Sequence, residues 1–297
     1  MDLLSLLYPG IDNSKERQQC LRSQASEPQE RDPLKLFLDE MTWREANAAI
    51  KRRAPAFLPT GPVEGHGPHM PLGCDCHIAE AFSVVIARKC RGVVLPTLPY
   101  NYAGATSTFR GTVSVPIDVQ VGMLKAIASS LWAQGFRSIF IVSVHGPNSI
   151  PIGNAVRTLF EDYRIPAVYL NPWPYFDDER IKEEVPRYDE PYKEAMLVFA
   201  AAQVLGKEDI IPDLGRLKNE EPPKEEAPTG LGTIQEHGMV GHHFRHELQH
   251  VPPRAGVKVE LGLEAYELAA TKMLPVVKAL KAYVEWLDRH PRRWIQP

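Results

Sequence analysis

The chain has 297 residues, of which 44% are hydrophobic and 24% are charged, and its formal net charge is −3 at pH 7. This composition is typical of a globular protein, and the lack of a sustained run of Lys and Arg argues against a nucleic-acid partner. The apolar start at 3–7 is too short for a signal sequence or a membrane span, and four cysteines are too few for a disulfide framework. We therefore expect a cytoplasmic protein with no membrane partner.

The first 40 residues are predicted to form an N-terminal arm, because the stretch from about 10 to 34 is polar and rich in Gln, Arg, Glu and Ser. Thr42 and Glu45 have the spacing of a capping box, which predicts a helix from there to about Arg52. Residues 41–297 are then expected to form one domain.

Short apolar runs alternate with helical periods along the rest of the chain. The runs at 56–58, 93–95, 139–144 and 167–170 predict strands, and apolar spacing predicts helices at 78–89, 124–131, 194–204 and 263–287. The β-branched run at 139–144 is typical of a central strand covered on both faces, and Gly135 suits the C-terminal cap of the helix before it. These features predict an α/β fold with a central, mostly parallel sheet flanked by helices.

The loop after the first predicted strand carries the strongest functional signal. Glu64 and His66 lie two residues apart, and Asp75 follows at the end of a short loop rich in Pro and Gly. Side chains at i and i+2 of an extended segment point the same way, so Glu64 and His66 can converge on one point, to which Asp75 can fold back. If the stretch around Asp75 is also extended, Cys74 and Cys76 point away from that site.

His145 is a fourth candidate ligand, because it directly follows the predicted strand at 139–144. In open α/β sheets, sites collect where loops leave the carboxyl ends of strands, so His145 can share a site with Glu64, His66 and Asp75. One such histidine alone is more often structural, whereas the four residues together predict a metal site. Two carboxylates and two imidazoles suit zinc, manganese or iron and suit calcium poorly. A bridging Asp75 could hold two ions roughly 3.5–4 Å apart.

The segment at 61–75, Gly-Pro-Val-Glu-Gly-His-Gly-Pro-His-Met-Pro-Leu-Gly-Cys-Asp, resembles the signature loop of the creatininase (creatinine amidohydrolase) family. Weaker similarities extend from roughly 40 to 285 and include the Gly-Thr-Val-Ser element at 111–114. The resemblance implies an α/β fold, a centre of two divalent metal ions with a bridging hydroxide, and usually a homohexamer. By this resemblance the metal ligands are Glu64, His66, Asp75 and His145.

The chain departs from the family pattern outside these four residues. A later family element reads His-Ala-Gly-Glu-x-Glu-Thr-Ser, and its best counterpart here is the segment at 189–196. The resemblance then implies Glu194 as a fifth ligand and places Asp189 where a histidine is expected. A pocket histidine expected shortly before Gly111 is replaced near Thr106. We infer from this altered pocket that the substrate is not creatinine itself.

Several further residues are candidates for supporting roles. His242 and His246 belong to a late histidine cluster and have a spacing that could bind metal on a helix, but glycines interrupt the stretch. A contact at the rim of the site is therefore preferred, with His243 as a candidate acid or base. His69 could orient Glu64 or a bound water.

Two other segments have open interpretations. His77 is expected to begin the helix after Asp75 as a capping or surface residue, and 212–230 is expected to be a loop or flap. The aromatic segment at 171–176 is equally compatible with a core and with a pocket wall.

The residues thus predict a metal-dependent hydrolase that uses Zn²⁺ or Mn²⁺, and the resemblance implies an amidohydrolase-like enzyme with two such ions per chain and a homo-oligomeric assembly. Its predicted reaction is attack of a metal-activated hydroxide on a C–N bond in a small polar cyclic amide, with Asp189 or a late histidine protonating the leaving group. One alternative is a hydrolase that cleaves a C–C bond in a cyclic ketone such as a keto-inositol. Another is a non-catalytic metal-binding subunit.

Overall fold

The computed structural model describes residues 35–185, 190–211, 230–237, 240–246 and 256–290, all of which belong to one compact unit that begins at Lys35. Most of the predicted arm, the predicted flap and Asp189 lie outside the described residues. At the start of this unit, Phe37 forms a bridge with Val94, so residues 35–40 contact the sheet.

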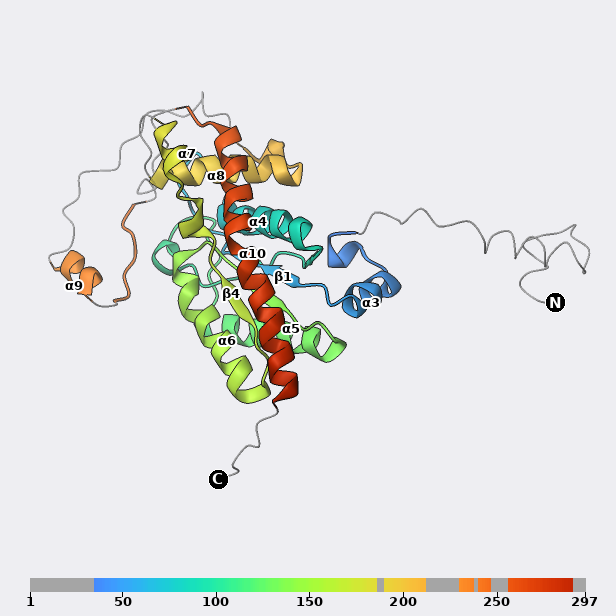
Figure 1. Ribbon diagram of the computed structural model, residues 1–297. Helices are drawn as coiled ribbons and strands as arrows, with labels where there is room; N and C mark the ends of the chain where they lie inside the picture. The colour runs from blue at the N-terminus through green and yellow to red at the C-terminus, as the bar shows by residue number, and fades with distance from the viewer. Residues whose placement is uncertain (1–34, 186–189, 212–229, 238–239, 247–255, 291–297) are drawn as a thin grey trace, which may run out of the picture. The chain divides into compact units, whose positions relative to one another are not determined.

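The centre of the unit is a parallel sheet of four short strands (Figure 1). The strands are β1 (Ala56–Pro59), β2 (Val93–Val94), β3 (Ile139–Val142) and β4 (Val168–Leu170), in the spatial order β2-β1-β3-β4. Phe57 pairs with Phe140, and Pro59 pairs with Val142, so β1 and β3 end side by side. Every residue of β1 and β3 is buried, as expected for strands covered on both faces. The predicted fold class is confirmed.

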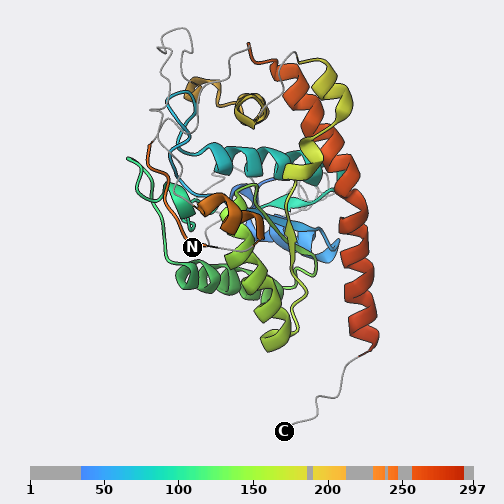
Figure 2. The same cartoon turned by 90° about the vertical axis from the view of Figure 1, so that its left-hand side faces the viewer.

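Alternate strand residues enter two separate cores. On one face, Phe57 and Phe140 pack with helices α4 (Cys74–Cys90), α8 (Glu190–Leu205) and α10 (Val259–Arg289). On the other face, Leu58 and Ile141 pack with α3 (Trp43–Lys51), α5 (Ile117–Gln134) and α6 (Ser149–Tyr163). Figure 2 shows α4 and α5 on opposite sides of the sheet. This layering leaves the carboxyl edge of the strands to the connecting loops.

The helix ends follow local signals. Thr42 and Glu45 form the expected capping box at the start of α3, and Gly135, with φ 110°, caps the end of α5. Helix α4 begins at Cys74 behind Gly73, which provides no side-chain cap, so Asp75 lies in the first helical turn. The stretch at 74–76 is therefore helical, so the condition under which Cys74 and Cys76 would point away from Asp75 is not met, and the expected helix start at His77 is wrong.

The remaining elements are a helix that was not predicted, a helix whose predicted start was too late, and several short helices. Helix α6 was not anticipated, and α10 begins four residues before its predicted start at 263. The short elements are η1 (Leu38–Glu40), η2 (Gly104–Thr106), η3 (Gly146–Asn148), η4 (Trp173–Phe176), α7 (Glu179–Glu183), η5 (Glu208–Ile210) and α9 (Leu231–His237). Within the described residues, no helix has the length and apolar character needed to cross a membrane.

Candidate metal centre

Three separate segments deliver the predicted ligands to the carboxyl edge of the sheet. The loop after β1 carries Glu64 and His66, the first turn of α4 carries Asp75, and the turn after β3 carries His145. Since β1 and β3 are parallel neighbours in register, the loops that follow them begin at the same edge.

Four donor atoms converge there. His145 Nδ1 lies 3.2 Å from Glu64 Oε1 and 3.1 Å from Asp75 Oδ2. His66 Nε2 lies 3.6 Å from the same Glu64 oxygen and 3.7 Å from the same Asp75 oxygen. One ligand atom from each of Glu64, Asp75 and His145 fits within 4.8 Å of the others. The structure thus brings together all four residues that the sequence predicts as the metal-binding core.

The separation of these atoms matches the needs of a metal ion. Ligand atoms bound at 2.0–2.1 Å in a tetrahedral zinc site lie about 3.3 Å from one another. The observed separations, from 3.1 to 3.7 Å, bracket that value. Nδ1 of His66 lies 3.2 Å from the carbonyl oxygen of Glu64, and a proton on Nδ1 would donate to this oxygen and direct the Nε2 lone pair toward the two carboxylates.

The electrostatics of the cluster also favour a cation. Glu64 and Asp75 are only 2% and 6% exposed, and two buried carboxylates at such close range require a positive partner. Burial by itself would lower the pKa of His145, but hydrogen bonds to Asp75 and Glu64, together with their charges, outweigh burial and raise it to about 10. The two carboxylates thus favour positive charge at this point, which a divalent ion would supply more strongly.

A buried amide network fixes the loops that hold the ligands. The side-chain oxygen of Asn101 accepts hydrogen bonds from Thr60 Oγ1 at 2.8 Å, Gln120 Nε2 at 2.6 Å and Asn148 Nδ2 at 3.0 Å. Asn148 also donates to Ser143 Oγ at 3.0 Å, so its contacts bracket the turn of His145. All five side chains are buried. The network connects the ends of β1 and β3, and the sequence analysis did not identify it.

Tyr169 is a second residue that the sequence analysis missed. Its hydroxyl, on β4, is buried and has no hydrogen-bond partner among the described residues. Burial and the negative charge of Asp75 raise the pKa of Tyr169 to about 12. Tyr169 pairs with Ile141 of β3 in the sheet, and its only sequence signal was its position near the end of a predicted strand.

The structure describes some of the other predicted site residues and not all of them. Asp189 lies outside the described residues. Glu194, on α8, is partly buried, and its charge adds to burial and to the charge of Asp75 in raising the pKa of Cys74. Helix α8, which carries Glu194, packs with α4 in one core, and the grouped ligand atoms come from Glu64, Asp75 and His145. His69 is fully buried on the signature loop, and its role stays a prediction.

The late histidine segment reaches the loops around Glu64. Residues 240–246 are irregular, so the four-residue spacing of His242 and His246 does not create a helical metal site. The backbone N–H of Phe244 donates to the carbonyl of Ala105 at 2.9 Å, and its ring packs on Phe109 with centroids 6.3 Å apart. His243, which precedes Phe244, is exposed. This placement agrees with a rim position, and the catalytic role of His243 stays a prediction.

The thiols beside Asp75 have structural contacts. The thiol of Cys76 donates to the carbonyl of Gly61 at 3.1 Å, and Cys74 belongs to the core around α4.

The aromatic segment at 171–176 contributes to the same core. Phe176 is fully buried there and Trp173 packs against it, whereas Tyr175 is 40% exposed. Within the segment at 171–176, Phe176 and Trp173 therefore have a core role.

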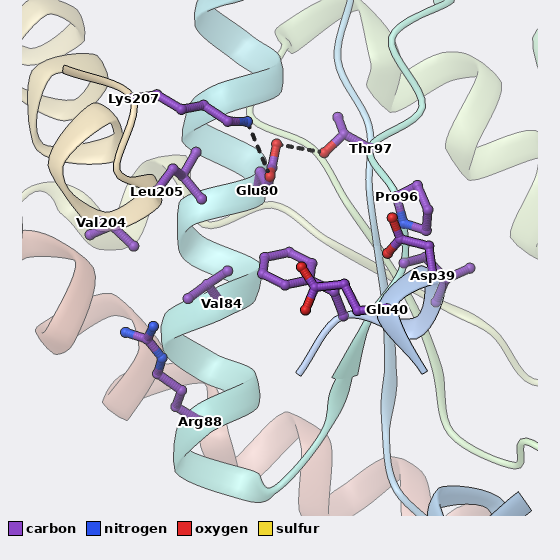
Figure 3. Close-up of a pocket in the computed structure, with 12 residues that line it drawn as sticks. Asp39, Glu40, Glu80, Val84, Arg88, Pro96, Thr97, Val204, Leu205 and Lys207 are labelled. Atoms are coloured by element: carbon purple, nitrogen blue, oxygen red, sulfur yellow. Dashed lines mark hydrogen bonds and ion pairs between the residues drawn. The ribbon is translucent and has the colours of Figure 1, made fainter. Parts of the chain in front are cut away.

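A cavity of about 540 Å³ lies beside α4 (Figure 3). None of the predicted ligands lines it. Lys207 pairs with Glu80 at 3.4 Å, and Thr97 donates to Glu80 at 3.0 Å. These contacts attach the segment after α8 and the segment after β2 to the helix that carries Asp75.

Comparison with known proteins identifies the family. Residues 39–202 match the family model described as creatininase, creatinine amidohydrolase. The chain belongs to the creatininase family. The match spans more than half of the chain and includes Glu64, His66, Asp75, His145 and Glu194, and it confirms the resemblance found in the signature loop.

Two relatives in the creatininase family differ in the activity for which they are named. The creatinine amidohydrolase of Pseudomonas putida is 27% identical over 164 residues, which are 50% of this chain and 62% of that protein. The mycofactocin precursor peptide peptidase of Mycobacterium ulcerans (strain Agy99) is 31% identical over 112 residues, which are 35% of this chain and 44% of the peptidase. The aligned part of the chain thus spans less than two thirds of either relative.

Solved creatininase structures share the fold. A mutant creatininase complexed with creatine superposes with a TM-score of 0.60 at 21% identity, covering 86% of this chain and 99% of the other. A mutant described as the Zn-Zn type gives 0.61 at 21% identity, covering 84% and 98%. A manganese form of creatininase gives 0.57 at 22% identity, covering 86% and 99%. At these identities the comparison establishes the fold alone.

Proposed function

We propose that this protein is a metal-dependent hydrolase that cleaves a C–N bond in a small polar amide. The observation that carries the proposal is the convergence of two carboxylates and two imidazoles, within 3.1–3.7 Å, at the carboxyl edge of a parallel sheet. A donor set of this composition and spacing suits zinc or manganese. The zinc and manganese forms of creatininase agree with that choice of metal.

The chain's own residues have distinct parts in this proposal. Glu64, His66, Asp75 and His145 would hold the metal, and Glu194 would add a fifth ligand from α8 if two ions bind. When bound, divalent ions lower the pKa of water toward neutrality and polarise a carbonyl oxygen. His243 and Asp189 are the candidates for protonating the leaving nitrogen, and His69 is the candidate for orienting a ligand or a water.

The substrate proposed is a small cyclic amide other than creatinine. By family resemblance, a pocket histidine expected near Thr106 is replaced in this chain, which supports a substrate different from creatinine. The peptidase relatives favour a second candidate, the amide bond of a short peptide. Both relatives are named for cleavage of C–N bonds, so they favour amide hydrolysis over cleavage of a C–C bond in a cyclic ketone.

The proposal is tested by measuring metal content and product formation on the same preparations. We expect the purified chain to contain at least one zinc or manganese ion and to release amine from a panel of cyclic amides and short peptides. Glu64→Gln should lose metal and activity together. Asp162→Asn, which breaks an exposed ion pair with Lys125, is the control and should lose neither.

The outcomes separate this proposal from its alternatives. A new carboxylate formed without amine release would support C–C cleavage. Stoichiometric metal with no turnover across the panel would support a non-catalytic metal-binding subunit. Full turnover by metal-free enzyme would contradict the proposal. A homo-oligomer, with a hexamer implied by family resemblance, is part of the same proposal and is tested by sedimentation of the metal-loaded protein.

A further inference from the structure

The hydroxyl of Thr106 occupies an unassigned position beside a predicted ligand. Thr106 ends the short turn η2 and is only 4% exposed. Its side-chain Oγ1 donates a hydrogen bond to Oε2 of Glu64. Thr106 is also close to where the family pattern has a histidine, so this contact belongs to a part of the site in which the chain differs from its family pattern.

The two oxygens of Glu64 face different partners. Oε1 lies toward the metal-binding core, 3.2 Å from His145 Nδ1 and 3.6 Å from His66 Nε2. Oε2 faces Thr106. A carboxylate whose second oxygen accepts a hydrogen bond from a buried hydroxyl has one oxygen directed at the metal, whereas a carboxylate without that donor can rotate to offer both oxygens.

The turn that carries Thr106 is held from several sides. The backbone N–H of Phe109 donates to the carbonyl of Thr106 at 2.9 Å, and the N–H of Phe244 donates to the carbonyl of Ala105 at 2.9 Å. The ring of Phe109 lies against Gly65, where an added Cβ would come within 3.1 Å of it. The Thr106 hydroxyl is therefore fixed relative to the loop that carries Glu64.

We propose that Thr106 is a positioning residue that restricts Glu64 to binding metal through Oε1 alone. The inference rests on the proposed metal-dependent function and adds to it how one ligand is oriented. Hydrogen-bond partners of metal ligands typically contribute 10- to 100-fold to metal affinity. Because Thr106 acts through Glu64, its loss should change the affinity and the coordination of the metal without removing a ligand.

The test compares three variants in their binding of Co²⁺ alone. Thr106→Val keeps the shape of the side chain and removes the hydroxyl, Thr106→Ser keeps the hydroxyl, and Ser107→Ala removes a different hydroxyl from the adjacent position. Co²⁺ is added to the metal-free full chain, its affinity is measured by titration, and its visible absorption spectrum reports the coordination geometry. Thermal unfolding of each metal-free variant shows whether it folds.

We expect Thr106→Val to weaken Co²⁺ binding by about 10- to 100-fold and to change the spectrum toward a higher coordination number. Thr106→Ser should retain the affinity and spectrum of the unaltered chain, as should Ser107→Ala. If Thr106→Val does not fold, Thr106→Ala is measured in its place and should give the same loss.

Two results would overturn the inference, and they are distinguishable. If the unaltered chain binds Co²⁺ and Thr106→Val binds it with the same affinity and spectrum, Thr106 does not position Glu64, and the proposed function is unaffected. If the unaltered chain itself binds no Co²⁺, the proposed function fails and the inference fails with it.

Discussion

Asp75 Oδ2 lies 3.1 Å from Nδ1 of His145, although the two residues are 70 positions apart and belong to a helix and to the turn after a strand. The contact forms because the first turn of α4 and the turn after β3 both lie at the carboxyl edge of the sheet. It places a buried carboxylate and an imidazole in contact at the edge where α/β folds bind their ligands. The proposed function depends on this meeting point.

Replacing Asp75 should abolish the stabilisation of the folded chain by metal. A metal that binds only the folded state, at 100 times its dissociation constant, raises the free energy of unfolding by about 2.7 kcal/mol. We expect the unaltered chain to show this gain with Zn²⁺ or Mn²⁺ and Asp75→Asn to show none. Chemical denaturation with and without metal measures the gain. An equal gain in both proteins would contradict the assignment of Asp75 as a ligand.

Replacing Asn148 should weaken the fold at the base of the site. Asn148→Ala removes the acceptor of Gln120 and the donor to Ser143 and Asn101, and leaves these buried polar groups without those partners. We expect a loss of about 1–3 kcal/mol in the free energy of unfolding. Asn154→Ala, at an exposed position on α6, is the matched control and should cost much less. Similar losses in both variants would show that the buried network is not important.

Replacing His243 should separate chemistry from metal binding. His243 is exposed on the segment at 240–246, whose neighbour Phe244 contacts the loop above Glu64. If His243 transfers a proton to the leaving group, His243→Gln should lower kcat by roughly 10²- to 10⁴-fold with an unchanged metal content. His290→Gln, at the exposed end of α10, serves as the control. An unaltered kcat would leave Asp189 as the remaining candidate acid.

The thiols should resist alkylation in the folded chain. Burial raises the pKa of Cys90 from 9.0 to about 11, so its thiolate fraction at pH 8 falls about 100-fold relative to the unfolded chain. A thiol whose pKa is raised stabilises the fold below pH 9, and this contribution is lost as the pH rises toward 11. We expect mass spectrometry to show slow iodoacetamide labelling of Cys90 in the native protein and fast labelling in urea. Equal labelling rates in both states would contradict the partly buried environment of Cys90.

The sequence predicted that Glu64, His66, Asp75 and His145 would converge because their signals are local and because parallel strands end at one edge of the sheet. Glu64, His66 and Asp75 occupy one short motif, and His145 follows a β-branched run that is typical of a central strand. Parallel strands end at one edge, so these residues could be expected to meet there without knowledge of their packing.

The buried amide network and some helix boundaries were missed because no clear local sequence pattern indicates them. Asn101 and Asn148 are 47 residues apart, and nothing in either segment shows that they share a buried network. Helix α6 has apolar residues at helical spacing, at 152, 155, 156 and 159, but a proline and a glycine in its first turns obscured that period. The start of α4 was misplaced because Gly73 provides no capping side chain.

The most direct test of the metal centre is an anomalous-scattering map from crystals grown with Zn²⁺ or Mn²⁺. We predict a peak within about 2.0–2.2 Å of side-chain donor atoms of Glu64, Asp75 and His145. A second peak near His66 and Glu194 would support the two-ion form. A map from metal-replete crystals with no peak within bonding distance of these residues would contradict the account.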